Sequence, residues 1–223
     1  MVTKNKTSKY NIKKEMDLIV KKIYHIKQTF NVFQKIRLEE EYKSISDRLP
    51  YTSSVILSAL FNEVILGLSK LIVDGDNQNL CIYAFLKKYR NNKNDFKEQK
   101  YINLKDRETD KRSRLYLESG EIEKDIEDLE NFLKNNKHIK DYISKLRSKD
   151  IAHNDRKMNF NKNYKPEELK IKVTYEEIEM LIDNLFKHMN NIYCTLFKTS
   201  FAFYDDITPE LKYLNNILKK DIE

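Results

Sequence analysis

The chain has 223 residues, of which 40% are hydrophobic and 35% are charged. It contains only three Gly and three Pro, whereas a sandwich, a barrel or a many-stranded sheet needs a turn about every 8–12 residues. The composition therefore excludes those folds and favours an all-α protein. The 14 Tyr and 11 Phe, together with many Ile and Leu, suffice to build a core, so the high charge does not indicate a disordered chain.

The formal net charge of +7 favours a polyanionic partner such as RNA, DNA or an acidic protein. A Lys-rich composition with solvated surfaces explains the same charge equally well. Cys81 and Cys194 stand apart in apolar stretches without the spacing of a zinc site, so we expect two small buried hydrophobic residues in a reducing compartment. The sequence predicts neither a metal site nor a disulfide.

The N-terminal sequence MVTKNKTS lacks the apolar segment of a signal peptide, and a membrane-spanning helix needs about 20 predominantly apolar residues. The longest apolar stretch, residues 55–73, carries Asn62 and Glu63 at its middle. We therefore expect a cytoplasmic protein that does not span a membrane.

Residues 11–33 carry apolar side chains at alternating spacings of four and three, which predicts an amphipathic helix with a narrow, coiled-coil-like seam. The charged segment 34–47 is also expected to be helical and to end at Pro50. Thr52–Val73 is apolar almost all round, which predicts a buried central helix whose N-cap is Thr52 or a neighbouring hydroxyl residue.

After a turn at residues 74–77, we expect a short helix that ends near Tyr89. Residues 90–112 are polar and predict a loop or an insertion. Apolar spacing then predicts helices over 115–133 and 138–150.

The last part of the chain has two helix N-terminal signatures. Thr174 and Glu177 form an S/T-x-x-E capping box that opens a long helix to about residue 198. Thr208 and Pro209 predict the start of a terminal helix within residues 206–223. No repeat and no change of composition divides the sequence, so we predict a single helical domain over residues 1–223, with its core at about 10–198. The expected architecture is an up-and-down bundle with extra N- and C-terminal helices.

Charge is distributed in blocks along the chain. The segments 87–114 and 134–149 are strongly basic, and the segment between them, 118–130, is strongly acidic. Such blocks are usually solvated helix faces. The alternative is that the basic segments contact a nucleic-acid backbone.

The segment 145–155, with the sequence KLRSKDIAHND, is the most distinctive chemically. In a regular helix, Arg147 and His153 are about 120° apart around the axis and about 9 Å apart along it. One helix alone therefore makes a poor site, whereas two copies of the chain could bring both pairs into one cleft. The alternative is that both are surface or capping residues. His25, His138 and His188 lack a metal-spaced partner, and we interpret them as ordinary surface or boundary residues.

The string LRSKDIAHND resembles the Arg-x(4–6)-His signature of the HEPN superfamily, the higher eukaryotes and prokaryotes nucleotide-binding domain. Lys two residues after the Arg, Ala before the His and Asn-Asp after it most resemble the abortive-infection branch called AbiU-like. The end of the predicted central helix, LSKLIVD at residues 68–74, is similar to a Leu- and Asp-containing helix end of that branch. The resemblance covers roughly residues 10–198.

The resemblance implies a homodimeric helical bundle that acts as a metal-independent endoribonuclease, without a cofactor, in a toxin–antitoxin or antiphage system. Arg147 and His153 would then be the catalytic pair, since His transfers protons near neutral pH and Arg binds phosphoryl oxygens. The expected RNA- or phosphate-binding residues around them are Lys145, Lys149, Ser148 and Asn154. Ser148 stands where the family often has Asn, Asp or His, and this departure places the level of activity in question.

Three hypotheses remain open at this point. The first is a cytoplasmic endoribonuclease with RNA as substrate, a second copy as partner and an antitoxin protein as a further possible partner. The second is a catalytically silent HEPN bundle that binds RNA, a nucleotide or a protein. The third is a helical interaction protein in which Arg147 and His153 are incidental. No phosphate-binding Gly loop, HExxH motif or nucleophile elbow supports another class of enzyme.

Overall fold

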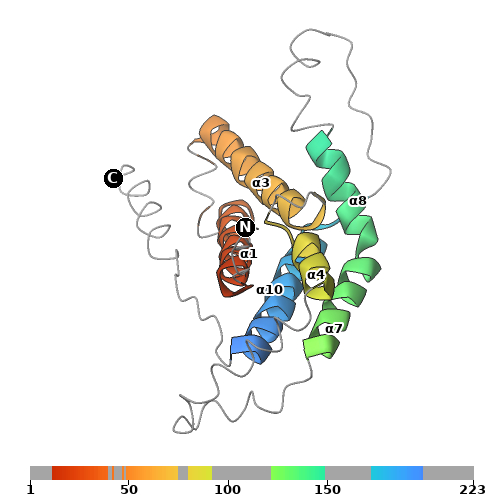
Figure 1. Ribbon diagram of the computed structural model, residues 1–223. Helices are drawn as coiled ribbons and strands as arrows, with labels where there is room; N and C mark the ends of the chain where they lie inside the picture. The colour runs from red at the N-terminus through yellow and green to blue at the C-terminus, as the bar shows by residue number, and fades with distance from the viewer. Residues whose placement is uncertain are drawn as a thin grey trace, which may run out of the picture.

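The computed structural model describes residues 12–39, 42, 47, 49–74, 80–91, 122–148 and 172–197. Within this part of the chain the fold consists of six helices and no strand, which confirms the all-α prediction (Figure 1). The helices are α1 (Ile12–Leu38), α3 (Pro50–Ile72), α4 (Ile82–Asn91), α7 (Ile122–Asn135), α8 (Lys137–Leu146) and α10 (Tyr175–Phe197). The loop predicted at 90–112 is wrong for Arg90 and Asn91, which belong to α4. The rest of it and the predicted terminal helix at 206–223 lie outside the described residues.

Helix α1 packs against both α3 and α10 (Figure 1). The predicted seam is confirmed, because every one of its apolar side chains is buried: Ile12, Met16, Ile19, Ile23, Ile26, Phe30 and Phe33. Burying a side chain of this size contributes about 1.5–3 kcal/mol relative to leaving it in water. The helix continues to Leu38, which confirms the helical prediction for the first residues of the segment 34–47.

The start of α3 differs from the prediction. Pro50 occupies the first turn of α3, and Leu49, not Thr52 or a neighbouring hydroxyl residue, is the N-cap residue. The reason is that the fixed φ of Pro suits the first helical turn, where a missing N–H costs nothing. The Ser53 hydroxyl donates a hydrogen bond to the Pro50 carbonyl oxygen at 3.3 Å.

The two halves of α3 have different environments. Its C-terminal half is buried against α1, and Gly67 permits the contact, since a Cβ there would lie 2.7 Å from Cγ1 of Ile26. In the N-terminal half, Tyr51 is 83% exposed and Val55 is 52% exposed. The prediction of a buried central helix is therefore wrong for this half, because the apolar composition cannot show which faces find a neighbour.

Helix α3 is also the one helix among the described residues that is long and apolar enough to cross a membrane, by length and composition. The core helix of a helical bundle can meet the same two criteria, and 39% of the relevant window is buried within this fold.

The start of α10 confirms the capping box. The Glu177 N–H donates to Oγ1 of Thr174 at 3.2 Å, and the Thr174 N–H donates to Oε2 of Glu177 at 2.7 Å. The other Glu177 oxygen lies 3.3 Å from Nε2 of His138. The hydrogen bond from the Thr174 backbone, followed by the one from His138, lowers the pKa of Glu177. This carboxylate thus connects the start of α10 to the start of α8.

Both cysteines are buried free thiols, as predicted. Cys81 lies just before α4, where its sulfur accepts a hydrogen bond from the Ala84 N–H at 3.3 Å. Cys194 belongs to the last, fully buried turn of α10.

Candidate active site

Arg147 is the C-cap residue of α8, with helical backbone angles of φ −57° and ψ −47°. Its backbone N–H donates to the carbonyl oxygens of Ile143 and Ser144. Ile143 is fully buried, so the last turn of α8 is anchored to the core. The Arg147 side chain starts from this rigid position and is 39% exposed.

Two side chains at the end of α3 hold the guanidinium of Arg147. Its Nη1 donates to Oγ of Ser69 at 3.0 Å and forms a short ion pair with Oδ1 of Asp74. Ser69 is fully buried, and the Asp74 side chain is 19% exposed. The sequence suggested a solvated helix end, whereas the structure places Arg147 in a half-buried contact with a helix that is 73 residues away in the chain.

The backbone at the end of α3 positions both acceptors. The N–H groups of Val73 and Asp74 donate to the Ser69 carbonyl oxygen at 2.8 and 3.0 Å. Ser69 and Asp74 are therefore joined within one turn and present two oxygens to the same nitrogen. Both contacts use Nη1, and within the described residues Nη2 and Nε of Arg147 have no recorded partner. A guanidinium in this state can still offer planar, charged donors to a phosphate.

Asp74 is the site residue that the sequence analysis did not identify. It was noted only as the last residue of the LSKLIVD helix end, separately from Arg147. One signal in the sequence could have indicated this contact: Asp74 lies in one of the two segments that resemble the family, and Arg147 lies in the other. A spacing pattern within one segment cannot reveal a contact between the two.

Two further predicted site residues lie in the same turn as Arg147. Lys145 is exposed, and the Ser148 hydroxyl donates to the Lys145 carbonyl oxygen at 3.2 Å. The structure thus brings together Arg147, Ser148 and Lys145. The other three predicted site residues, His153, Lys149 and Asn154, lie outside the described residues.

Two lysines that the sequence analysis did not single out add positive charge near Asp74. Burial, followed by repulsion from Lys70, lowers the pKa of the Lys22 amine on α1, and the Asp74 carboxylate opposes this shift. Lys22 and Lys70 therefore share the electrostatic environment of the carboxylate that holds Arg147. Glu63 opposes the shift as well, so two lysines and Arg147 are set against two carboxylates, and a small excess of positive charge remains. Among the described residues, no group of three or more His, Cys, Asp or Glu is arranged to hold a metal ion.

The comparison with protein families matches most of the chain. The family model HEPN_AbiU2, described as AbiU2, matches residues 9–217. No curated protein and no solved structure matches the chain significantly. The match contains both halves of the Arg147–Asp74 contact.

Proposed function

The chain belongs to the AbiU2 family of HEPN domains, which is associated with abortive infection, and from this premise we propose that it is a metal-independent endoribonuclease. It acts in the cytoplasm as an antiphage or toxin–antitoxin effector. Its substrate is RNA, and its site is shared between two copies of the chain.

The observation that carries this proposal is the anchored guanidinium of Arg147. Arg147 differs from an ordinary exposed arginine, because a buried hydroxyl and a carboxylate at the end of another helix hold its guanidinium. The Ser69 and Asp74 contacts restrict the fork of Arg147, and they use only Nη1, so that among the described residues Nη2 and Nε are left for a ligand. Preorganised donors of this kind stabilise charge that develops in a transition state, because they need not reorient during the reaction.

The chemistry assigned to each residue follows from its ordinary properties. RNA cleavage without a metal requires a proton to leave the 2′-OH, a proton to reach the 5′-oxygen, and stabilisation of the charged phosphorane. His153 transfers protons, since imidazole titrates near neutral pH. Arg147 binds the phosphoryl oxygens. The RNA backbone is contacted by Lys145, Lys149, Ser148 and Asn154.

The decisive experiment is incubation of the purified protein with RNA in excess EDTA, followed by analysis of the product ends. We expect cleavage with 2′,3′-cyclic phosphate and 5′-hydroxyl ends, and its loss in Arg147→Ala and in His153→Ala. His25→Ala is the matched control, because His25 is an exposed histidine of α1, 4.0 Å from Oε1 of Glu63 and separate from the proposed site. Full cleavage by both site variants would overturn the proposal.

The shared site requires a homodimer. The sequence argument for a second copy is that a regular helix through residues 147–153 would hold Arg147 and His153 about 120° apart, so that one copy alone would not bring both side chains to one phosphate. Sedimentation at micromolar concentration is expected to show a dimer. A monomer that retains full activity would contradict the shared site and leave the nuclease assignment intact.

One observation favours a second candidate, a catalytically silent bundle that binds RNA, a nucleotide or an antitoxin protein. Ser148 donates its hydroxyl proton to the Lys145 carbonyl oxygen, and that hydrogen bond points its donor toward its own helix rather than toward a ligand. Ser148→Asn, which supplies a longer side chain with two donors, distinguishes the two. A nuclease should cleave RNA at least as fast after this change, whereas a silent bundle should show no cleavage with either residue.

A further inference from the structure

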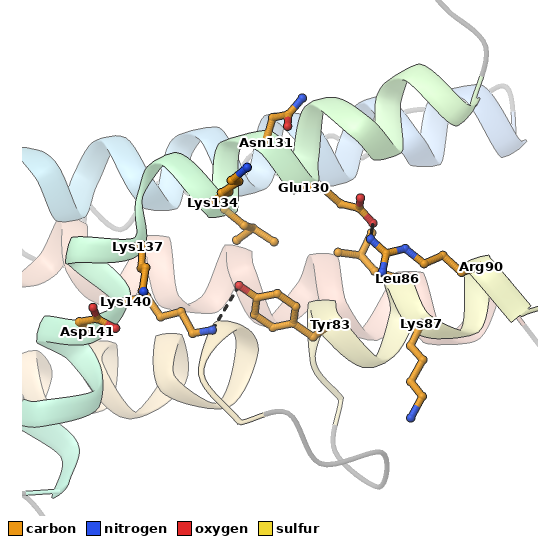
Figure 2. A pocket seen from close by; sticks show the side chains of 11 residues that line it. Tyr83, Leu86, Lys87, Arg90, Glu130, Asn131, Lys134, Lys137, Lys140 and Asp141 are labelled. Atoms are coloured by element: carbon orange, nitrogen blue, oxygen red, sulfur yellow. Dashed lines mark hydrogen bonds and ion pairs between the residues drawn. The ribbon is translucent and has the colours of Figure 1, made fainter.

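A groove of about 850 Å³ lies between α4 and the junction of α7 with α8. Figure 2 shows its side chains, with Tyr83 and Arg90 on α4 facing Lys140 and Glu130 on the opposite wall. This volume falls in the range of about 300–1,000 Å³ that is typical of ligand pockets. We call it the α4–α8 groove.

The two walls are joined by polar contacts. Nη2 of Arg90 lies 2.6 Å from Oε1 of Glu130. Nζ of Lys140 donates to the Tyr83 hydroxyl at 3.3 Å and lies 4.4 Å from the centre of the Tyr83 ring. Figure 2 marks the Lys140–Tyr83 contact as it crosses the groove. These contacts fix the spacing of the walls without any ligand.

Positive charge dominates the lining. Two carboxylates, Glu130 and Asp141, face five cationic side chains, which are Lys87, Arg90, Lys134, Lys137 and Lys140. Lys134 and Lys137 are exposed, and neither has an ion pair with a residue that the structure describes. Gathering like charges is unfavourable unless an anion is present. The groove is therefore suited to a ligand with several negative charges.

The lining of the groove reaches Lys140 and Asp141 on α8, and Arg147 lies at the C-terminal end of the same helix. Lys140 and Arg147 are seven residues apart, which places them about 20° apart around the helix and about 10.5 Å apart along it. A stacked nucleic-acid strand advances about 3.4 Å per nucleotide. A strand with one phosphate at Arg147 thus reaches Lys140 about three nucleotides further on.

We propose that the α4–α8 groove binds the phosphate backbone of the RNA strand next to the nucleotide that Arg147 contacts. The inference rests on the proposed function, because it takes Arg147 as the point where the strand is cut. Lys134, Lys137 and Lys140 neutralise phosphates. The alignment of Lys140 with Arg147 favours a strand over a free nucleotide, which shares the phosphate chemistry but does not span both positions.

The test measures the affinity for a fluorescein-labelled 12-nucleotide RNA that is 2′-O-methylated throughout and therefore cannot be cleaved. The double variant Lys134→Gln/Lys137→Gln should bind about tenfold more weakly, and its salt slope should flatten by about 1.4 log units per log unit of salt, as expected for two lost contacts to single-stranded RNA. The matched control is Lys124→Gln/Lys187→Gln, two exposed lysines of α7 and α10 outside the groove lining. It loses the same charge and should keep the wild-type slope.

Equal weakening by both double variants would overturn the inference, since net charge would then explain it. A groove variant that binds ATP more weakly but the RNA unchanged would also overturn it, in favour of a free nucleotide. The nuclease proposal is tested separately, by cleavage of unmodified RNA. If the wild-type protein cleaves RNA and the groove variant binds RNA as tightly as the wild type, only the inference about the groove is contradicted. If RNA binding depends on the groove but no RNA is cleaved, only the proposed nuclease activity is contradicted.

Discussion

The cationic side chains at the two ends of α8 differ in how far they are paired with acceptors. At the C-terminal end, Arg147 is matched by one carboxylate and one buried hydroxyl from α3. At the N-terminal end, Lys137 and Lys140 line a groove in which cations outnumber carboxylates. A cation that is paired and oriented suits the stabilisation of one phosphate in a defined geometry, whereas an excess of cations supplies affinity for a charged strand. One short helix thus carries both features.

The largest effect is expected from Arg147→Lys. The change keeps the charge but loses the planar guanidinium. Arginine can contact Ser69 and Asp74 with one nitrogen and offer its other two to a phosphate, whereas lysine has a single ammonium group. We expect kcat to fall by about 10²–10³-fold, the range found when one transition-state donor is removed. Single-turnover cleavage at saturating RNA measures this directly. A rate within threefold of wild type would show that charge alone is needed at this end too.

The next effect concerns the partner of Arg147. Asp74→Asn removes the negative charge but keeps an oxygen acceptor, so Arg147 loses part of its orientation. Misplacing a reacting group costs up to about 10²-fold in rate, and we expect kcat to fall by about tenfold. Because the Arg147 side chain is 39% exposed, the ion pair should contribute no more than about 1 kcal/mol to folding. A lower melting temperature with unchanged kcat would mark the pair as purely structural.

The groove should show the opposite kinetic signature. Lys134→Gln/Lys137→Gln is expected to raise KM about tenfold while kcat changes by less than about threefold, because a uniform binding interaction affects the ground state and the transition state alike. Steady-state kinetics on a short RNA measure both constants. A loss confined to kcat would contradict the division of roles between the two ends of α8.

The smallest effect is on the pH dependence of folding. Burial, opposed by Asp128 and Asp125, lowers the pKa of His188, which packs against Phe132. A histidine with a lowered pKa resists protonation in the folded state. Its contribution to stability is therefore fully present above the ordinary pKa of about 6.5 and is lost as the pH falls below that value.

His188→Gln should accordingly reduce the loss of melting temperature between pH 7.5 and 5.5 by about 2 °C or less. Burial also raises the pKa of Asp125, which acts in the opposite sense at lower pH. Thermal melts at both pH values measure the difference. The same melts provide a baseline for the pH dependence of cleavage, which is assigned to His153. If the melting temperature of His188→Gln falls with pH as much as that of the wild type, His188 does not titrate within this range.

Most of the helices could be predicted from the sequence, because apolar spacing and capping are local properties of the chain. The seam of α1, the Thr174–Glu177 capping box and the candidacy of Arg147 could all be predicted in this way. The start of α3 was predicted less accurately, because a proline such as Pro50 can either end one helix or occupy the first turn of the next.

The contacts between these local features could not be predicted from the sequence, because they depend on the tertiary structure. Asp74 and Arg147 are 73 residues apart. Lys87 and Arg90 line the α4–α8 groove together with Lys134, Lys137 and Lys140 only because α4 packs beside the α7–α8 junction. The tertiary structure also left one half of α3 exposed although both halves are apolar. The physical reason is that periodicity specifies which face of a helix seeks a partner, whereas the crossing of helices decides which partner that face obtains.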